Sequence, residues 1–338
     1  MLRPFEPSDS PQAATIWTAA CGPDLAISPH LVEYNTRPAT GAIQAGRVAM
    51  QDGQPAGFVM ASALPASPDV SPPQFGWIDA VAVSPAFQRQ GIGSLLLAWA
   101  EAWLAAQGCT HARLGGSLRP FTPGLPVELD AGVFFDKRGY QGRARGSVDW
   151  DVARDLDEYQ TLAPHAHLPW RAVPGSAGVS NTKYQISNAS IRVAQSGDED
   201  AMVAFFQRVF PGRWRFEFQE FLREGGRRSD YMLLWTERVV DGFARLTFED
   251  SERPIERFHM RRLPRPWGQL GPIGVSDDWR GKGYGGALLD AGLRRLRECG
   301  VRGCVIDWTS LLDFYGKFGF KPYRQYAMLV KAFEWTEL

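Results

Sequence analysis

The chain has 338 residues, of which 44% are hydrophobic and 22% are charged, as in globular proteins long enough for two domains. Its net charge is zero, with −4 on residues 1–180 (12 Lys+Arg, 16 Asp+Glu) and +4 on residues 181–338 (25 and 21), too small a split to indicate nucleic-acid binding. No apolar run approaches the roughly 20 residues of a membrane span, and the N-terminal residues lack a hydrophobic signal region, so we expect no membrane partner.

The four cysteines are scattered, at Cys21, Cys109, Cys299 and Cys304. Their spacing fits neither a zinc site nor a disulfide framework. We therefore expect no metal and a reducing, cytoplasmic location.

The first half predicts a sheet with helices. In chain order we expect strands at 1–5, 47–50, 57–61, 77–83, 112–114 and 143–152, and helices at 11–20, 94–107 and around 133–135. Asp52-Gly53 is a typical hairpin turn between the second and third strands.

After residue 160 the periodicity fades in a Pro- and Gly-containing stretch, and then the same order of elements starts again. We expect strands at 191–193, 231–236, 239–248, 270–275, 301–308 and 326–332, and helices at 198–210, 216–223, 287–299 and 311–318. The expected organisation is a first domain at 1–160, a linker at 161–188 and a second domain at 189–338. Each domain is expected to be α+β, with a mixed, mostly antiparallel, twisted sheet flanked by helices.

An internal repeat joins a strand to a helix through a glycine loop in both halves. The two copies are Gln88-Arg89-Gln90-Gly91-Ile92-Gly93-Ser94 and Arg280-Gly281-Lys282-Gly283-Tyr284-Gly285-Gly286. Such a loop exposes backbone N–H groups at the positive end of the helix dipole. This arrangement suits a phosphate group.

The pattern Q/R-x-x-G-x-G between a strand and a helix resembles motif A of the GNAT N-acetyltransferases. A second motif of that family, F-Y-x-K-x-G-F, is matched by Phe314-Tyr315-Gly316-Lys317-Phe318-Gly319-Phe320, and its first-half counterpart is Phe134-Phe135-Asp136-Lys137-Arg138-Gly139-Tyr140. Because both motifs occur in both halves, the chain is similar to a tandem GNAT protein.

The resemblance implies that acetyl-CoA is the co-substrate and that its acetyl group passes directly to a primary amine, without a metal or a covalent enzyme intermediate. It also implies that both glycine loops hold the pyrophosphate. The preceding strands would pair with the pantetheine arm through Val81, Ala82 and Val83, and through Ile273, Gly274 and Val275.

The resemblance favours the second half as catalytic. The family's tyrosine, which can protonate the leaving thiolate, is Tyr315 in the second half, whereas Phe135 stands in its place in the first. A core role for the Tyr315 ring is the alternative. Two departures count against the second half. Pro272 lacks an N–H group, and Trp308 replaces an asparagine that is common in the family. The first half lacks this asparagine too and has Glu128 in its place.

The general base is less clearly marked. Asp307 could accept a proton directly or through water, although a carboxylate that pairs with a neighbouring arginine is the more ordinary interpretation. Asp79 has the analogous position in the first half, and Glu33 is a weaker candidate. Four aromatic residues could line an acceptor pocket or form plain core: Trp214, Phe216, Phe218 and Phe221. We expect His165, His167 and His259 at the surface.

Two alternatives to a transferase remain at this point. One is a CoA-binding or regulatory protein on a degenerate GNAT scaffold. The other is a Rossmann-type oxidoreductase, because Gly281-x-Gly283-x-x-Gly286 also fits the dinucleotide pattern, with Asp307 further along. The acceptor and the oligomeric state stay open.

Overall fold

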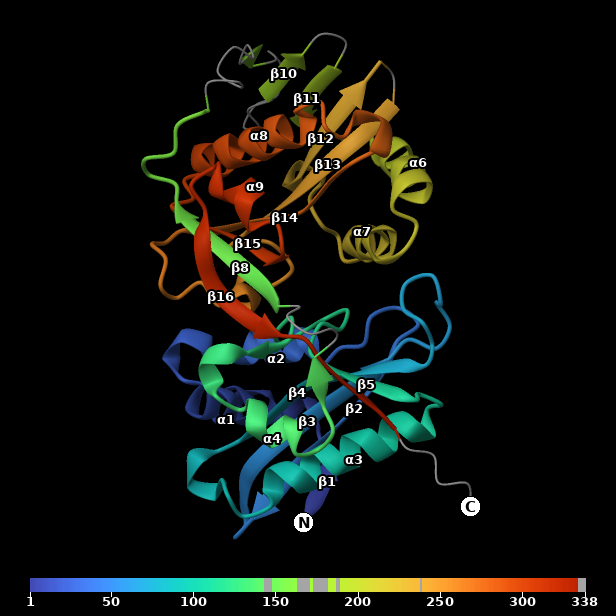
Figure 1. The fold of residues 1–338 in the computed structure, drawn as a ribbon, viewed down its shortest axis with the longest axis vertical. Helices are drawn as coiled ribbons and strands as arrows, with labels where there is room; N and C mark the ends of the chain where they lie inside the picture. Colours follow the sequence, from blue (N-terminus) through green and yellow to red (C-terminus); the bar gives the residue numbers. More distant parts are fainter. Residues whose placement is uncertain (143–147, 163–170, 173–181, 187–188, 238, 334–338) are drawn as a thin grey trace. The chain divides into compact units, whose positions relative to one another are not determined.

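A computed structural model describes residues 1–142, 148–162, 171–172, 182–186, 189–237 and 239–333. The chain divides into two compact units: the first contains Met1–Asp151, Glu256–Arg262 and Tyr323–Leu338, and the second contains Val152–Ile255 and Leu263–Pro322. Each unit is a mixed sheet flanked by helices (Figure 1), so the predicted α+β tandem fold is confirmed. None of the helices in the described ranges is long and apolar enough to cross a membrane.

The first sheet has the strand order β1-β2-β3-β4-β5-β17-β7. Its strands are β1 (Leu2–Pro4), β2 (Ile43–Gln51), β3 (Gln54–Ala63), β4 (Phe75–Val83), β5 (His111–Leu114), β7 (Gln141–Gly142) and β17 (Leu329–Ala332). The helices of this unit are α1 (Ser10–Cys21), α2 (Pro29–Asn35), α3 (Ile92–Ala106) and α4 (Gly132–Asp136). The sequence analysis did not predict α2, a seven-residue helix.

Helices cover both faces of the first sheet because its central strands are apolar on both sides. On β3, Val59 packs in a cluster with Leu96 and Leu104 of α3, whereas the adjacent Phe58 packs in a second cluster with Trp17 of α1. Successive side chains of a strand point to opposite faces. A strand that is apolar at every position therefore lies between two helical layers.

The second sheet has the strand order β6-β16-β8-β15-β14-β13-β12-β11-β10-β9. Its strands are β6 (Leu125–Pro126), β8 (Val148–Asp155), β9 (Arg171–Ala172), β10 (Thr182–Ile186), β11 (Ala189–Val193), β12 (Tyr231–Thr236), β13 (Val239–Phe248), β14 (Trp267–Val275), β15 (Gly303–Thr309) and β16 (Lys321–Ala327). The helices are α6 (Glu199–Val209), α7 (Arg213–Arg223), α8 (Tyr284–Glu298) and α9 (Leu312–Gly316). The expected linker, 161–188, lies outside the described residues except for 161–162, β9 and β10.

The helices of the second unit also occupy both faces of the sheet (Figure 1). Phe206 of α6 and Phe218 of α7 stack on one another, with ring centroids 4.8 Å apart, and cluster around Phe243 of β13. On the other face, α8 approaches so closely that a Cβ at Gly292 would lie 2.6 Å from Leu270.

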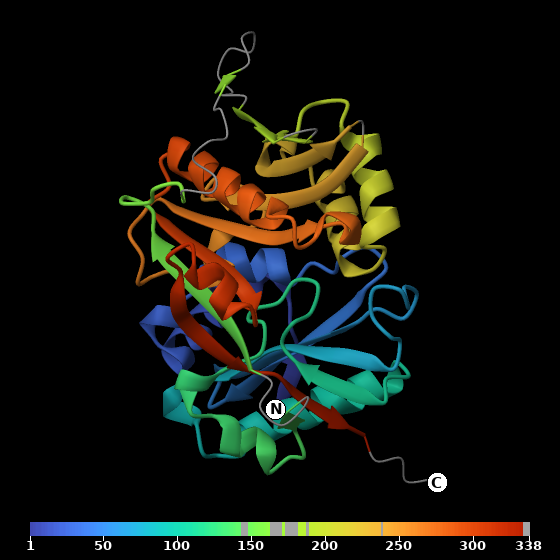
Figure 2. The same ribbon diagram turned by 45° about the horizontal axis from the view of Figure 1, so that its top comes forward.

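The two units are not contiguous in sequence, unlike the expected domains. The strand that we expected to close the first half is β8, and it lies between β15 and β16 in the second sheet. The last strand of the chain, β17, lies between β5 and β7 in the first sheet (Figure 2). Apolar alternation identifies a strand but not its partner, so the sequence pattern could not show this exchange.

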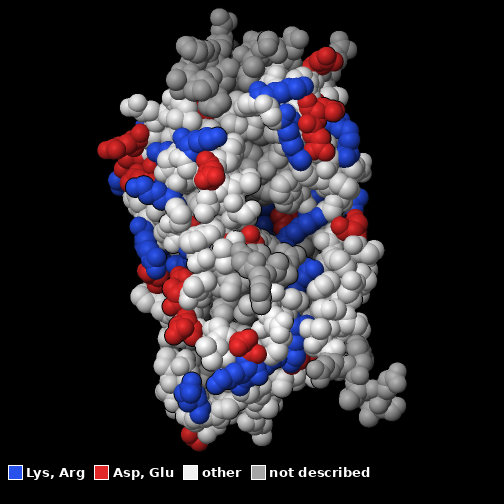
Figure 3. Space-filling view, in the orientation of Figure 1, with Lys and Arg blue, Asp and Glu red and all other residues white. Residues whose placement is uncertain are grey.

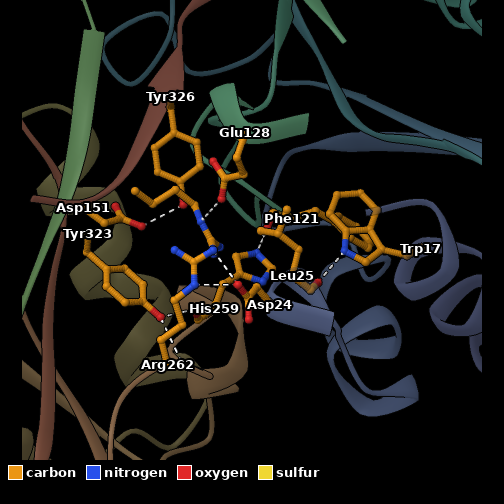
Figure 4. Close-up of polar contacts among 11 residues, drawn as sticks. Trp17, Asp24, Leu25, Phe121, Glu128, Asp151, His259, Arg262, Tyr323 and Tyr326 are labelled. Carbon is orange, nitrogen blue, oxygen red and sulfur yellow. Dashed lines mark hydrogen bonds and ion pairs between the residues drawn. The ribbon is translucent and has the colours of Figure 1, made fainter. Parts of the chain in front are cut away.

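A short segment of the second half, residues 256–262, belongs to the first unit (Figure 4). His259 is only 1% exposed there and hydrogen-bonds through Nε2 to the carbonyl oxygen of Phe121 at 3.0 Å. The Tyr323 hydroxyl donates to the His259 carbonyl at 3.0 Å, and Arg262 pairs with Asp24 at 2.5 Å. The expectation of a surface His259 was therefore wrong, and burial lowers the pKa of this imidazole to about 3. His165 and His167 lie outside the described residues.

The same cluster contains a fully buried cation, Arg324, whose guanidinium lies 2.6 Å from Glu128. Glu128→Ala should lower the free energy of unfolding by about 2 kcal/mol, because a buried charge without its partner is strongly destabilising and Glu128 is partly exposed. Urea denaturation of the variant would measure this loss. Glu33→Ala, which removes an exposed carboxylate from α2, is the control and should change stability by less than about 0.5 kcal/mol. Equal midpoints for the two variants would contradict the prediction.

Candidate functional site

Each glycine loop turns into its helix at a residue in the left-handed region. Gly91 has φ 84° and precedes α3, and Gly283 has φ 85° and precedes α8. A Cβ at either glycine would meet no atom within 4 Å. Open space therefore lies beside the first amides of both helices, where an anion could approach the backbone.

The first residue of each motif ties the loop to the end of its strand. Gln88 donates through Nε2 to the carbonyl of Val83 at 3.0 Å, and Arg280 donates through Nε to the carbonyl of Val275 at 3.1 Å. The two side chains differ in charge but make the same bond. This explains physically why either a glutamine or an arginine can start the motif.

The strand before each loop separates from its parallel neighbour. The register of β4 with β5 ends at Ile78 and Leu114, and that of β14 with β15 ends at Gln269 and Val305. Beyond these points, the predicted pantetheine-pairing residues pair with β3 or β13 on one side. They are Val81, Ala82 and Val83 in the first unit, and Ile273, Gly274 and Val275 in the second. Their other side can accept an extended ligand as an added strand.

A β-bulge marks the separation in both units. Gly271 and Pro272 of β14 together oppose Arg245 of β13, and Asp79 is the extra residue of β4. The missing N–H group of Pro272 therefore falls where the ladder is already interrupted, the position at which a sheet tolerates proline.

Several loop side chains have packing roles. Ile92 and Tyr284 are buried, and Tyr284 contacts Trp279 edge-on at 5.1 Å between ring centroids. The Lys282 ammonium lies 4.8 Å from the centroid of Trp279. In the first unit, Ser94 is hydrogen-bonded by Arg138.

The first loop is also more crowded near its second glycine. A Cβ at Gly93 would lie 3.3 Å from Phe134, whereas one at Gly285 would meet nothing within 4 Å. The left-handed position held by Gly281 (φ 74°) in the second loop is held by Arg89 (φ 63°) in the first. Gln90 donates to the Ala86 carbonyl at 3.3 Å. The backbone of the second loop, which includes Gly286, is therefore less covered by side chains than that of the first.

The second unit contains both predicted catalytic residues, and the charge of Asp307 acts on Tyr315. Tyr315 lies in α9 and is 5% exposed, and Asp307 lies near the end of β15. Burial, together with the charge of Asp307, raises the pKa of Tyr315 to about 12. Burial also raises the pKa of Asp307, although a hydrogen bond from Gln269 opposes this shift. Tyr315 thus keeps its proton at neutral pH, as a proton donor must.

Charged residues that the sequence analysis did not select surround Asp307. Glu217 of α7 accepts a hydrogen bond from Arg213 at 2.7 Å. Burial alone would raise the pKa of Glu217, but the charges of Arg213 and Arg253 bring it below its usual value. Arg253 also acts on Asp307 by its charge, and Asp307 accepts a hydrogen bond from the Gln269 amide at 2.8 Å. The i,i+4 spacing of Arg213 and Glu217 is the feature of the sequence from which this ion pair could have been predicted.

The first unit has a different arrangement. Asp79 is 2% exposed and accepts hydrogen bonds from Ser62 at 2.8 Å and Gln44 at 3.1 Å. Burial raises the pKa of Asp79 to about 6. Phe135, which replaces the tyrosine, is 4% exposed, and Glu33 is exposed on α2. No proton donor therefore stands at the tyrosine position of this half.

The four aromatic residues have two different roles. Phe216, Phe218 and Phe221 are buried, the last two in the core cluster of α6 and α7. Trp214 is partly buried, and its ring lies so close to Gly274 that a Cβ there would be 2.9 Å away. Trp214 is therefore the member of the four that lies against a predicted pantetheine-pairing residue.

Known proteins resemble the chain in both halves. The acetyltransferase (GNAT) family matches residues 14–117 and 199–320. A mycothiol acetyltransferase of Saccharomonospora viridis is 32% identical over 141 residues, which cover 37% of this chain and 42% of that protein. The alignment thus spans less than half of that relative's length.

Solved structures share the fold over nearly the whole chain. The glucosamine N-acetyltransferase region of a fungal multi-domain β-N-acetylglucosaminidase has a TM-score of 0.82 at 22% identity, over 98% of this chain and 38% of that one. A tandem GNAT protein from the clavulanic acid biosynthesis pathway has a TM-score of 0.68 at 16% identity, over 100% and 99% of the two chains. With the family matched over more than half of its residues, in two separate regions, this chain belongs to the acetyltransferase (GNAT) family.

Proposed function

We propose that the protein transfers an acetyl group from acetyl-CoA directly to a primary amine, and that its second half carries out the reaction. The observation that carries this proposal is the open glycine loop of the second half, which follows the point where β14 separates from β15. Asp307 lies near the end of β15, and its charge acts on the buried hydroxyl of Tyr315 in α9. An acid and a base are thus available next to a place for an extended thioester.

The loop and strand residues would bind the co-substrate. A Cβ at Gly281, Gly283 or Gly285 would meet nothing within 4 Å. The amides of these residues would hold the pyrophosphate, assisted by the exposed Lys282. Ile273, Gly274 and Val275 would pair with the pantetheine arm. The first loop, 88–94, and Val81, Ala82 and Val83 would offer a second such site.

The proposed chemistry needs two proton transfers. The amine nitrogen attacks the thioester carbon, and its proton passes to Asp307, directly or through water. The C–S bond then breaks, and the CoA thiolate takes the proton of Tyr315. The products are thus the amide and the protonated thiol of CoA. A backbone N–H of β14 would stabilise the intermediate oxyanion.

A binding role is the second candidate, and it is favoured for the first half alone. Phe135 cannot donate a proton, and Asp79 already accepts bonds from Ser62 and Gln44. The first half would then bind acetyl-CoA without turning it over. If calorimetry found CoA binding but no amine of a panel were acetylated, this non-catalytic role would extend to the whole chain.

Acetylation of amines by the purified protein tests the proposal. Glucosamine is the first acceptor to try, since a structural neighbour is a glucosamine N-acetyltransferase, followed by polyamines and amino acids. We expect equal amounts of free CoA thiol and of a product heavier by one acetyl group. Binding of NADH without any CoA signal would instead support an oxidoreductase and end the proposal.

A further inference from the structure

A row of three polar side chains crosses the second sheet beside the candidate site. Thr247 of β13 is the direct register partner of Gln269 of β14, and Gln269 is the partner of Val305 of β15. Asp307 comes two residues after Val305 and therefore points to the same face. Thr247 and Gln269 are 2% and 1% exposed, whereas Asp307 is partly exposed, so the row runs from the buried interior of the sheet toward solvent.

The orientation of the Gln269 amide is determined by its neighbours. Its Nε2 donates to the Gly271 carbonyl at 3.1 Å and to Oδ1 of Asp307 at 2.8 Å, and its Oε1 accepts from the Thr247 hydroxyl at 2.9 Å. A backbone carbonyl can only accept a hydrogen bond. The NH₂ group must therefore face Gly271 and Asp307, and a rotated amide would place an oxygen against two acceptors.

The bulge provides the room for this contact. Gly271 has φ +154°, and a Cβ on it would lie 2.7 Å from Nε2 of Gln269 and 3.4 Å from Oδ1 of Asp307. In the first unit the extra residue of the bulge is Asp79. The second unit thus has its carboxylate on β15 and leaves the bulge free for the amide contact.

We propose that Gln269 is a positioning residue, which holds Oδ1 of Asp307 and so fixes the orientation of the carboxylate that would take the proton of the acceptor amine. The inference rests on the proposed function, because it assumes that Asp307 is the base. Gln269 itself is 1% exposed, and we therefore expect it to act through Asp307 and not by touching the substrate.

The charges that face Asp307 set the direction of the expected pH effect. The charged groups that act on Asp307 are Glu217 of α7 and Arg253. The charge of Asp307 in turn raises the pKa of Tyr315 of α9. Burial raises the pKa of Asp307, and the Gln269 amide and Arg253 lower it. Loss of the amide donor should therefore move the acid limb of the kcat/KM profile to higher pH.

Gln269→Leu tests the inference because leucine is similar in size but cannot donate. We expect kcat/KM for the amine to fall roughly tenfold at neutral pH, a part of the roughly 10²–10⁴-fold that a general base can contribute. The acid limb should shift upward, and the affinity for acetyl-CoA should be unchanged. Gln44→Leu is the matched control, since it removes a donor to Asp79 in the first half and should alter neither the rate nor the pH profile.

Asp307→Asn separates this inference from the proposed function. If Asp307→Asn keeps full activity, the proposed base is wrong; if it loses activity while Gln269→Leu behaves as wild type, only the positioning role is wrong. In the Asp307→Asn background, Gln269→Leu should add no further loss. An additive loss there would show a merely structural role and overturn the inference. If Gln269→Leu does not fold, Thr247→Val should shift the acid limb in the same direction by less, and an unchanged profile would overturn the proposal.

Discussion

Gly283→Val should abolish acetyl-CoA binding to the second half. Valine at this position would place its side chain in the open space beside the first amides of α8, where the pyrophosphate is expected. Losing two charge-assisted hydrogen bonds, at roughly 1.5–3 kcal/mol each, would weaken binding by at least about 100-fold. Isothermal titration calorimetry would measure the change, and the parallel variant Gly91→Val would report on the first loop.

A second glycine separates this effect from backbone strain. Gly300 follows α8 with φ +81°, and a Cβ on it would also meet nothing within 4 Å. Gly300→Val should therefore carry the same cost of about 1–2 kcal/mol for a left-handed valine, without any effect on CoA affinity. If Gly283→Val and Gly300→Val bound acetyl-CoA equally well, the loop would not be the pyrophosphate site.

Tyr315→Phe should lower kcat by roughly 10²-fold, the smallest effect usually found when a general acid is removed. The ring would remain in its contacts with Phe314 and Phe320, whose centroids lie 5.1 and 6.2 Å away. Stability and acetyl-CoA affinity should therefore change little. Steady-state kinetics of CoA release with a reactive amine would measure the loss.

Tyr140→Phe is the control for removing a buried hydroxyl. Tyr140 belongs to the corresponding motif of the first half, and its hydroxyl donates to Glu101 at 3.0 Å. This variant should turn over as wild type does. Full activity of Tyr315→Phe would make Tyr315 a packing residue and leave the leaving thiolate without an identified acid.

The glycine loops could be located from the sequence because they depend on local rules. Left-handed turns favour glycine, and helix starts follow apolar periodicity, so Gly91 and Gly283 were placed correctly between a strand and a helix. The strand Val239–Phe248 was predicted with its exact bounds. The segment 326–332, predicted as a single strand, is in fact β16 and β17, which end and begin on either side of Met328.

Burial and pairing between distant residues could not be predicted in this way. His259 lies in a Pro- and Arg-containing stretch that is typical of a surface loop, yet it contacts Phe121, which is far away in the sequence. Gln269 immediately precedes the predicted strand at 270–275, so its contacts with Thr247 and Asp307 were not considered.

The predicted balance of charge is consistent with Figure 3, where acidic and basic side chains are intermixed on the face shown.

The exchanged strands β8 and β17 have a consequence for the history of the repeat. A gene duplication ordinarily leaves two copies that can be lost or separated independently. Here, deletion of either copy would remove a strand from the interior of the surviving sheet, β17 from between β5 and β7 or β8 from between β15 and β16. Selection for folding alone would then preserve the first half, even if its own tyrosine position no longer supports catalysis.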